Sequence, residues 1–325
     1  MMDQAPFFDD VAEGPSGGQA VWAKTSDDLR IRVGWWRPAD TASEKGTVLI
    51  FPGRTEYIEK YGRDARVLTE AGYAVMAIDW RGQGIADRIT DNALIGHIGL
   101  FPDYQYDVAA ALDVATQVGL PQPWHVLGHS MGGCIALRSV MEGLPVNSAI
   151  FSAPMWGIRL AAPTRPAAWV LSWSGSRLGL GHLMSPGTKE APYPLDAEFE
   201  GNKLTSDQDM YDYMRRQLNT HPDLSLGGPS LHWLGQALAE TLHLARRPSP
   251  DMPCLTFLGT EEQIVDPSRV HSRMDAWPGG ELVMLDGGRH EVLMETPQLR
   301  DELFARLLDF LATHAEPSPR AAKSA

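Results

Sequence analysis

WHVLGHSMGGCIALRSVM, residues 124–141, is the stretch of this sequence that decides the fold. The residues just before Gly128 are apolar, as expected at the end of a buried strand, and 133–141 is apolar nearly all round, as a buried helix would be. Between them, Gly128 to Gly132 match G-x-S-x-G, a turn so sharp that the serine is strained and both glycines must lack side chains. We therefore predict that Ser130 is a nucleophile held out into a cleft, rather than a serine in an ordinary turn.

Two backbone amides are candidates for stabilising an oxyanion beside this serine. The amide of Met131 falls at the N-terminus of the predicted helix, where an unpaired N–H and the helix dipole favour negative charge. A second donor in such sites comes from the loop after an earlier strand, which here contains Gly53 and Arg54. We predict that this donor is the Arg54 amide. For the Arg54 side chain, the sequence offers a surface salt bridge with Glu56 or Glu59.

A serine hydroxyl is a poor nucleophile, so it needs a histidine to accept its proton and an acid to orient that histidine. Where a serine stands on such a turn, the acid and then the histidine follow it along the chain. His290 lies in a glycine-containing loop directly after the last predicted strand, late in the chain. We predict that His290 is the base, and that His125 and His129, in the strand and the turn, are structural.

The acid belongs to the loop that follows Leu258, where three carboxylates occur. Asp266 precedes a proline and matches a helix N-cap with proline at the first helical position. That leaves Glu261 and Glu262, either of which could reach an imidazole.

Strands and helices alternate through most of the chain, which predicts a mostly parallel, doubly wound α/β sheet. The predicted strands are 20–23, 29–36, 47–51, 73–78, 149–151, 254–258 and 281–285, and the predicted helices include 61–68, 104–118 and 299–311. The first two strands form a hairpin.

The rhythm changes between residues 154 and 250, where prolines and helical patches replace strands. We predict a helical cap at 154–250 inserted into a core of 19–153 and 251–314, with a flexible arm at 1–18 and a disordered tail at 315–325. The aromatic segment 167–173 either packs on the core or, with Trp233 and Leu234, lines a pocket for an acyl chain.

Composition limits the partners. The chain has 28 Lys and Arg against 41 Asp and Glu, a formal charge of −13, which repels nucleic acid and anionic lipid headgroups alike. Any contact with a membrane surface would be hydrophobic and made through the cap. The acidic first residues lack the basic start and apolar run of a signal peptide, so we expect a cytoplasmic protein, peripheral to the inner membrane if the cap binds lipid.

No cofactor or metal is predicted. Cys134 and Cys254 lie in apolar segments, as two reduced core thiols would. The run that begins at His290 is not H-E-x-x-H, and the glycines at 82 and 84 lack the third glycine of a phosphate-binding loop. We interpret the stretch 79–84 as a structural turn.

Together these motifs resemble the α/β-hydrolase superfamily, and within it the lysophospholipase and monoacylglycerol lipase group, in particular the bacterial lysophospholipase L2 type. The resemblance rests on PGRTE at 52–56 with Lys60 and Tyr61, DWRGQG at 79–84, GHSMGG at 128–133, and the loops of Gly259 and His290. It covers about 48–312 and is weakest over the insertion.

The resemblance implies an α/β-hydrolase fold in which Ser130 is the nucleophile, His290 the base, and the amides of Arg54 and Met131 the oxyanion hole. The family's aspartate lies three residues after the glycine that corresponds to Gly259, so the resemblance implies Glu262 as the acid, in place of the commoner aspartate. Monoacylglycerol lipases have His-Gly where this chain has Pro-Gly at 52–53, which favours the lysophospholipase side.

These observations predict a cofactor-free serine hydrolase that cleaves the carboxylic ester of a single-acyl lipid, a lysophospholipid or monoacylglycerol, through an acyl-enzyme. One alternative is a carboxylesterase acting on short, soluble esters. Another is a member of the fold that binds a ligand without turnover.

Overall fold

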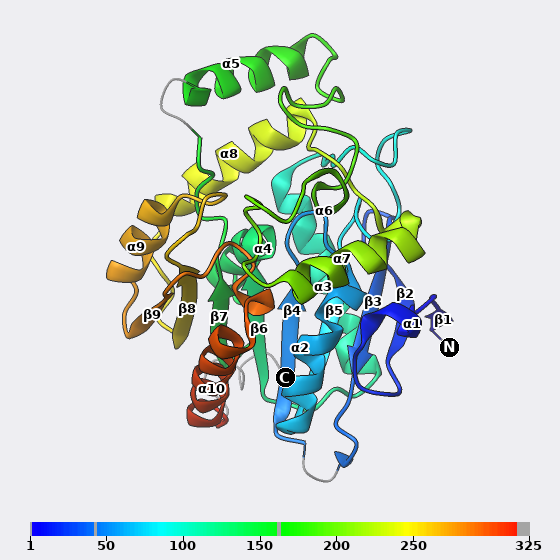
Figure 1. Ribbon diagram of the computed structural model, residues 1–325, viewed down its shortest axis with the longest axis vertical. Coiled ribbons are helices and arrows are strands. Elements are labelled where there is room, and N and C mark those ends of the chain that lie inside the picture. The colour runs from blue at the N-terminus through cyan, green and yellow to red at the C-terminus, as the bar shows by residue number, and fades with distance from the viewer. Residues whose placement is uncertain (1, 42–43, 161–163, 317–325) are drawn as a thin grey trace.

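The central feature is one twisted sheet in a computed structural model that describes residues 2–41, 44–160 and 164–316 (Figure 1). Within these residues the strand order is β1-β2-β3-β5-β4-β6-β7-β8-β9. The strands are β1 (Asp3–Gln4), β2 (Gln19–Lys24), β3 (Arg30–Trp36), β4 (Gly46–Phe51), β5 (Tyr73–Asp79), β6 (Trp124–His129), β7 (Ser148–Ser152), β8 (Cys254–Gly259) and β9 (Gly280–Leu285).

The strands from β5 through β9 in this order pair in parallel, while β1, β2 and β3 add an antiparallel edge. This confirms the predicted mostly parallel, doubly wound sheet. The helices are α1 (Asp9–Ala12), α2 (Gly62–Glu70), α3 (Tyr104–Gln117), α4 (Ser130–Met141), α5 (Thr164–Arg177), α6 (Tyr193–Asp196), α7 (Gln208–Thr220), α8 (Leu231–Ala245), α9 (Pro267–Asp275) and α10 (Pro297–Thr313). Short 3-10 helices are η2 (Ile58–Tyr61), η3 (Phe101–Asp103), η4 (Pro222–Leu224) and η5 (Val292–Met294).

Helices cover both faces of the sheet (Figure 1). Side chains of α2 and α10 join one hydrophobic cluster, and those of α3, α4 and α9 join the other. Every residue of β4 and β6 is buried, which explains why the apolar run at 47–51 shows no alternation with polar residues. Burial on both faces makes these central strands rigid, and the strands in turn hold the loops at their carboxyl ends in place.

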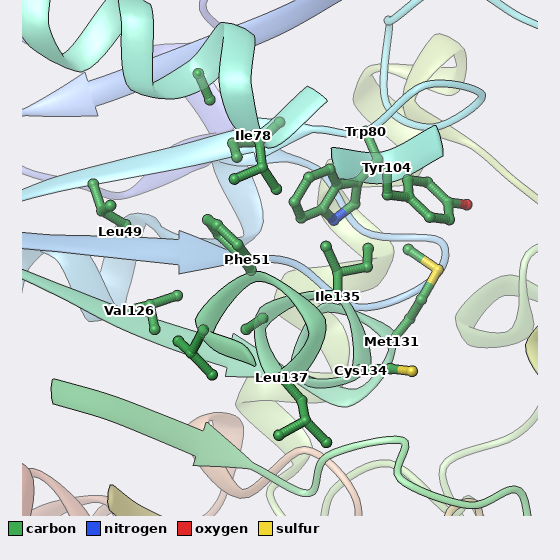
Figure 2. Packing of buried hydrophobic residues seen from close by; sticks show 14 of the residues in the cluster. Leu49, Phe51, Ile78, Trp80, Tyr104, Val126, Met131, Cys134, Ile135 and Leu137 are labelled. Carbon is green, nitrogen blue, oxygen red and sulfur yellow. The ribbon is translucent and has the colours of Figure 1, made fainter. Parts of the chain in front are cut away.

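Helix α4 is packed into the centre of the larger cluster (Figure 2). Phe51 at the end of β4 meets Trp80 edge to face, with ring centroids 5.2 Å apart. Met131, Cys134 and Ile135 on α4 are all buried in this cluster. The helix that carries the predicted nucleophile at its first residue is therefore anchored along its length by apolar contacts.

The segment between β7 and β8 contains α5 to α8, and its described residues add no strand to the sheet. In Figure 1 these helices lie beyond the carboxyl ends of the strands, with α5 outermost and packed on α8. Asp207 and Ser230 cap α7 and α8 by accepting hydrogen bonds from the amides of Met210 and Trp233. No described helix has the length and apolar character needed to cross a membrane.

The beginning of the chain is packed, contrary to the prediction of a flexible arm over 1–18. Val11 and Ala12 are buried. Gln217 donates a hydrogen bond to the Val11 carbonyl, Tyr213 donates one to Ala12, and the guanidinium of Arg32 donates one to the carbonyl of residue 6. The arm is held because side chains of the core and α7 satisfy its backbone carbonyls. The predicted disordered tail at 315–325 falls almost entirely outside the described residues.

Candidate active site

Ser130 occupies a strained turn between β6 and α4. Its φ of +49° lies in the left-handed region that a serine seldom adopts. A Cβ on Gly132 would overlap the carbonyl oxygen of Phe51, and a Cβ on Gly128 would lie 2.8 Å from the Gly132 carbonyl oxygen. The close approach of these backbones is the physical reason for both glycines in G-x-S-x-G, and it aims the serine away from the sheet.

Ser130, His290 and Glu262 form a continuous hydrogen-bonded series, although 160 residues separate the first two. The Ser130 hydroxyl lies 2.9 Å from Nε2 of His290, and Nδ1 of His290 lies 2.7 Å from Oε2 of Glu262. With the proton on Nδ1, the imidazole donates to the carboxylate and accepts from the hydroxyl. This arrangement can take a proton from the serine and hold the resulting imidazolium.

Glu262 is buried and held as a carboxylate. Its Oε1 accepts hydrogen bonds from the amides of Ile264 and Val265. Burial raises the pKa of Glu262, but the charge and hydrogen bond of His290, with those two amides, outweigh burial and lower it. The longer glutamate side chain is thus accommodated by anchoring its second oxygen on the backbone.

The other two candidate acids lie elsewhere. Glu261 is exposed. Asp266 accepts a hydrogen bond from the Ser268 amide at 3.1 Å and caps α9, which begins at Pro267 as the sequence predicts.

The loop that contains Arg54 is braced from below by the stretch 79–84. Trp80 donates to the carbonyl of Pro52 at 2.9 Å, and Gln83 donates to the carbonyl of Gly53 at 3.1 Å. Among the described residues, no acceptor is hydrogen-bonded to the Arg54 amide. The predicted structural turn therefore supports the loop beside the serine, where a free amide can meet a developing negative charge.

The Arg54 side chain does not form the surface salt bridge that the sequence offered. Glu56 pairs with Lys60 at 2.6 Å, and Glu59 pairs with Arg32 at 2.7 Å, because those partners are closer and buried with them. The Arg54 guanidinium instead donates to the Gly227 carbonyl in the cap at 2.7 Å. Burial lowers the Arg54 pKa to about 10, so the group keeps its positive charge at neutral pH.

A buried polar network lies directly beneath the site. The Lys60 ammonium is 2.6 Å from Glu56 and 2.7 Å from Glu291. Nε2 of His129 is 3.2 Å from Glu291 and 3.4 Å from Glu56. Glu56 also accepts from the Gly53 amide. The network thus joins the loop that contains Arg54 to the immediate neighbours of Ser130 and His290.

Sequence reasoning gave His129 a structural role and offered Glu56 as a partner of Arg54, but it did not predict that these residues form a network with Glu291. One signal was available for each carboxylate. Glu56 and Lys60 are spaced i, i+4, and Glu291 directly follows the predicted base. His125, the other histidine expected to be structural, is buried in β6 beside Ser148, and burial lowers its pKa to about 4.

Ligand atoms of Glu56, His129 and Glu291 all lie within 4.8 Å of one another, which is a spacing that can hold a metal ion. The Lys60 ammonium already contacts both carboxylates and supplies a compensating charge. A cation would have to displace that ammonium, so the donor set fits a lysine-centred network better than a metal centre.

A cavity of about 340 Å³ opens above the serine and the base. Its walls include the side chains or backbone of Arg54 and Met131 and are otherwise mostly apolar. Cap and loop residues that line it include Met155, Ile158, Pro194, Leu204, Met214, Leu218, Trp233, Leu234, Ile264 and Val265. Trp233 and Leu234 therefore line a cavity, as expected, and its use for an acyl chain stays a prediction. The aromatic segment 167–173 belongs to α5 and does not line this cavity, because α8 lies beneath it.

The whole chain is similar to several known proteins. A family model described as "Serine aminopeptidase, S33" matches residues 42–297. Lysophospholipase L2 of Escherichia coli K12 is 32% identical over 308 residues, covering 90% of this chain and 87% of that protein. Probable lysophospholipase L2 of Haemophilus influenzae is 27% identical, covering 81% of this chain and 83% of that protein. A solved monoglyceride lipase from Saccharomyces cerevisiae superposes with a TM-score of 0.72 at 20% identity, covering 95% of this chain and 99% of that one.

Proposed function

The chain belongs to this family of α/β hydrolases, and on that premise we propose that it is a serine hydrolase that cleaves the carboxylic ester of single-acyl lipids. The observation that carries the proposal is the 2.9 Å and 2.7 Å series from Ser130 through His290 to Glu262 at the floor of an apolar cavity. The named activity of the lysophospholipase L2 relatives supports the same substrate class.

The proposed reaction has two halves, acylation and deacylation, and Ser130, His290 and Glu262 take part in both. Ser130 Oγ attacks the ester carbonyl carbon while His290 Nε2 accepts its proton. Collapse of the tetrahedral intermediate breaks the bond to the alcohol oxygen, which takes that proton and leaves an acyl-enzyme. Water, deprotonated by His290, then attacks the acyl carbon. The bond from that carbon to Ser130 Oγ breaks, Oγ takes the proton back from His290, and the fatty acid leaves. Glu262 keeps the imidazole oriented and balances its charge throughout.

We assign the oxyanion hole to the amides of Arg54 and Met131. Both residues contact the cavity beside the serine. Met131 is the second residue of α4, where helix amides have no intrahelical acceptor. Losing one such donor typically costs about 3 kcal/mol of transition-state stabilisation.

The charges of the cavity favour a lipid ester over a peptide with a free N-terminus. A substrate ammonium would need an unpaired carboxylate. Of the described residues that line the cavity, the acids are Glu56 and Glu291, and both pair with Lys60. The apolar walls suit an acyl chain, which needs no partner of either charge.

We also propose that residues 154–250 act as a cap that touches a lipid surface. The side chains of Val170, Trp173 and Leu178 are 63%, 59% and 73% exposed on or just after α5. Exposed apolar side chains on one segment mark contact sites. Sedimentation with uncharged phosphatidylcholine vesicles should weaken in a Trp173→Ser variant but not in Met284→Ser, on β9. Equal binding by both variants would mean that the cap does not contact the lipid surface.

The central experiment is a hydrolysis screen with matched acyl chains. The protein should cleave lysophospholipids and monoacylglycerols, prefer long over acetyl p-nitrophenyl esters, and bind a fluorophosphonate covalently. Ser130→Ala should abolish both turnover and labelling. A preference for acetyl esters would favour the short-ester carboxylesterase, and labelling without turnover of any ester would reject the lipid assignment.

A further inference from the structure

Arg54 has no acid partner among the described residues, unlike three other enclosed arginines, Arg32, Arg81 and Arg300. Arg32 pairs with Asp79 and Glu59, Arg81 pairs with Asp107, and Arg300 pairs with Asp64. Among the described residues, no carboxylate lies within ion-pair distance of Arg54, and its bonded acceptor is one carbonyl, of Gly227. A guanidinium has five N–H donors, so most of its capacity is unused.

The position of this cation is set by the cap and the core together. The Arg54 guanidinium carbon lies 5.7 Å from the centre of the Trp233 ring, and Trp233 forms part of the cavity wall. Arg54 itself lines the cavity that holds Ser130 and His290. Because the aromatic ring and the carbonyl fix the planar guanidinium, it is preorganised for a ligand on its free edge.

Leaving such a charge inside the protein without a counter-ion is costly, and burial depresses the Arg54 pKa for that reason. The cost is recovered if an anion enters the cavity, because attraction between opposite charges is strong where water is excluded. Both carboxylates of the cavity wall bind Lys60, and neither lies within ion-pair distance of Arg54.

We propose that the Arg54 side chain binds the phosphate of the substrate headgroup, and thereby selects lysophospholipids over uncharged monoacylglycerols. This inference rests on the proposed ester hydrolysis and names the substrate within that class. Phosphate matches a guanidinium edge through two parallel N–H···O bonds. In a lysophospholipid the phosphate is joined to the ester through one glycerol unit, so both groups can occupy a single cavity.

The test compares two lipids that carry the same acyl chain, a lysophosphatidylethanolamine and a monoacylglycerol, in the same neutral detergent. In Arg54→Met, the ratio of their kcat/KM values should fall about 10- to 100-fold toward the monoacylglycerol. Displacement of the Arg54 amide from the oxyanion hole would lower both rates together, so the ratio isolates the side chain. Arg54→Lys should restore part of the ratio.

Arg88 supplies the matched control. It also donates to cap carbonyls, of Asp223 and Ser225, burial also lowers its pKa, and no described carboxylate pairs with it. It does not line the cavity. Arg88→Met should therefore leave the substrate ratio at the wild-type value. An equal shift in both methionine variants would mean that the arginines only clamp the cap, and would overturn the proposal.

A competition experiment separates a headgroup site from a general anion site. Glycerophosphoethanolamine should inhibit monoacylglycerol hydrolysis by the wild-type protein competitively, and more weakly in Arg54→Lys, whereas inorganic phosphate should inhibit less. Equal inhibition by both anions would reject headgroup recognition. If the wild-type protein cleaves neither lipid, the proposed function fails. If it cleaves both and the Arg54 variants keep the wild-type ratio and inhibition, only this inference fails.

Discussion

Two histidines with carboxylate neighbours lie side by side in this protein, their ring centroids 5.1 Å apart. His290 has one acid, Glu262, on one nitrogen and the Ser130 hydroxyl on the other. His129 faces two acids and a lysine, and its other nitrogen meets Ser152. An imidazole beside a carboxylate is therefore not enough to make a base. The nitrogen opposite the acid must face a nucleophile and a cavity.

The buried network around His129 has a different role from His290, and the positions of its members in the chain indicate this role. Glu56 lies two residues after Arg54, His129 precedes Ser130, and Glu291 follows His290. One charged network therefore contacts the three loops that carry the proposed site. We infer that it positions these loops, while Ser130, His290 and Glu262 at the floor of the cavity perform the chemistry.

Replacing each histidine by glutamine tests the comparison most strongly. His290→Gln should lower kcat on the order of 10⁶-fold, because no other described side chain is hydrogen-bonded to the Ser130 hydroxyl and able to accept its proton. His129→Gln should cost at most about 10²-fold, since it can only misplace groups that remain present. Steady-state kinetics of both variants, with circular dichroism to check folding, provide the measurement. Equal losses would contradict the separation of roles.

Replacing the proposed acid, Glu262, should have the next largest effect on kcat. Glu262→Gln should lower kcat on the order of 10⁴-fold, because the imidazole loses the partner that fixes its tautomer. Glu261→Gln is the matched control, since this neighbour is exposed. Asp266→Asn should affect the stability of α9 more than turnover. If Asp266→Asn lost activity and Glu262→Gln did not, Asp266 would be the acid.

The sequence predicted much of this arrangement because local patterns determine it. The strand, sharp turn and helix around Ser130 follow from apolar runs and two glycines, and the N-cap role of Asp266 follows from the proline after it. These signals lie within a few residues of one another, so a single chain displays them.

The remaining features depend on contacts between distant parts of the chain. The choice between Glu261 and Glu262 is a choice of which side chain turns inward, and the residue spacing alone did not decide it. The packing of Val11 and Ala12 depends on Gln217 and Tyr213, some two hundred residues away. The partner of Arg54 was mispredicted because Glu56 and Glu59 are near in sequence but bind other cations.

Stability should respond to the buried network more than to any surface pair. Glu291→Gln removes the carboxylate that binds both the Lys60 ammonium and Nε2 of His129 inside the protein, and breaking these buried ion pairs should reduce the free energy of unfolding by about 3 kcal/mol. Urea denaturation measures this change. Glu281→Gln, which breaks the exposed pair with Arg306, is the control and should leave the midpoint within experimental error. Similar effects of the two variants would show that the network is hydrated and weak.

The smallest expected effect is a pH dependence that belongs to His129. Burial lowers the pKa of His129, but Glu291 and Glu56 outweigh burial and raise it above its usual value. The charges of the network explain why the pKa of His129 is raised. Two carboxylates and the single Lys60 ammonium leave one negative charge, and a protonated His129 cancels it. A folded state with a raised pKa binds the proton more tightly than the unfolded chain, whose histidine pKa is about 6.5.

This stabilisation is therefore fully present below about pH 6.5 and is lost as the pH rises through the folded-state pKa. The difference in free energy of unfolding between wild type and His129→Gln should shrink steadily from pH 6 to pH 9. Repeating the comparison in a His290→Gln background removes the titration of the neighbouring ring. A difference that stays constant over this range would mean that His129 remains neutral, and the two histidines would then differ in their contacts alone and not in their charge.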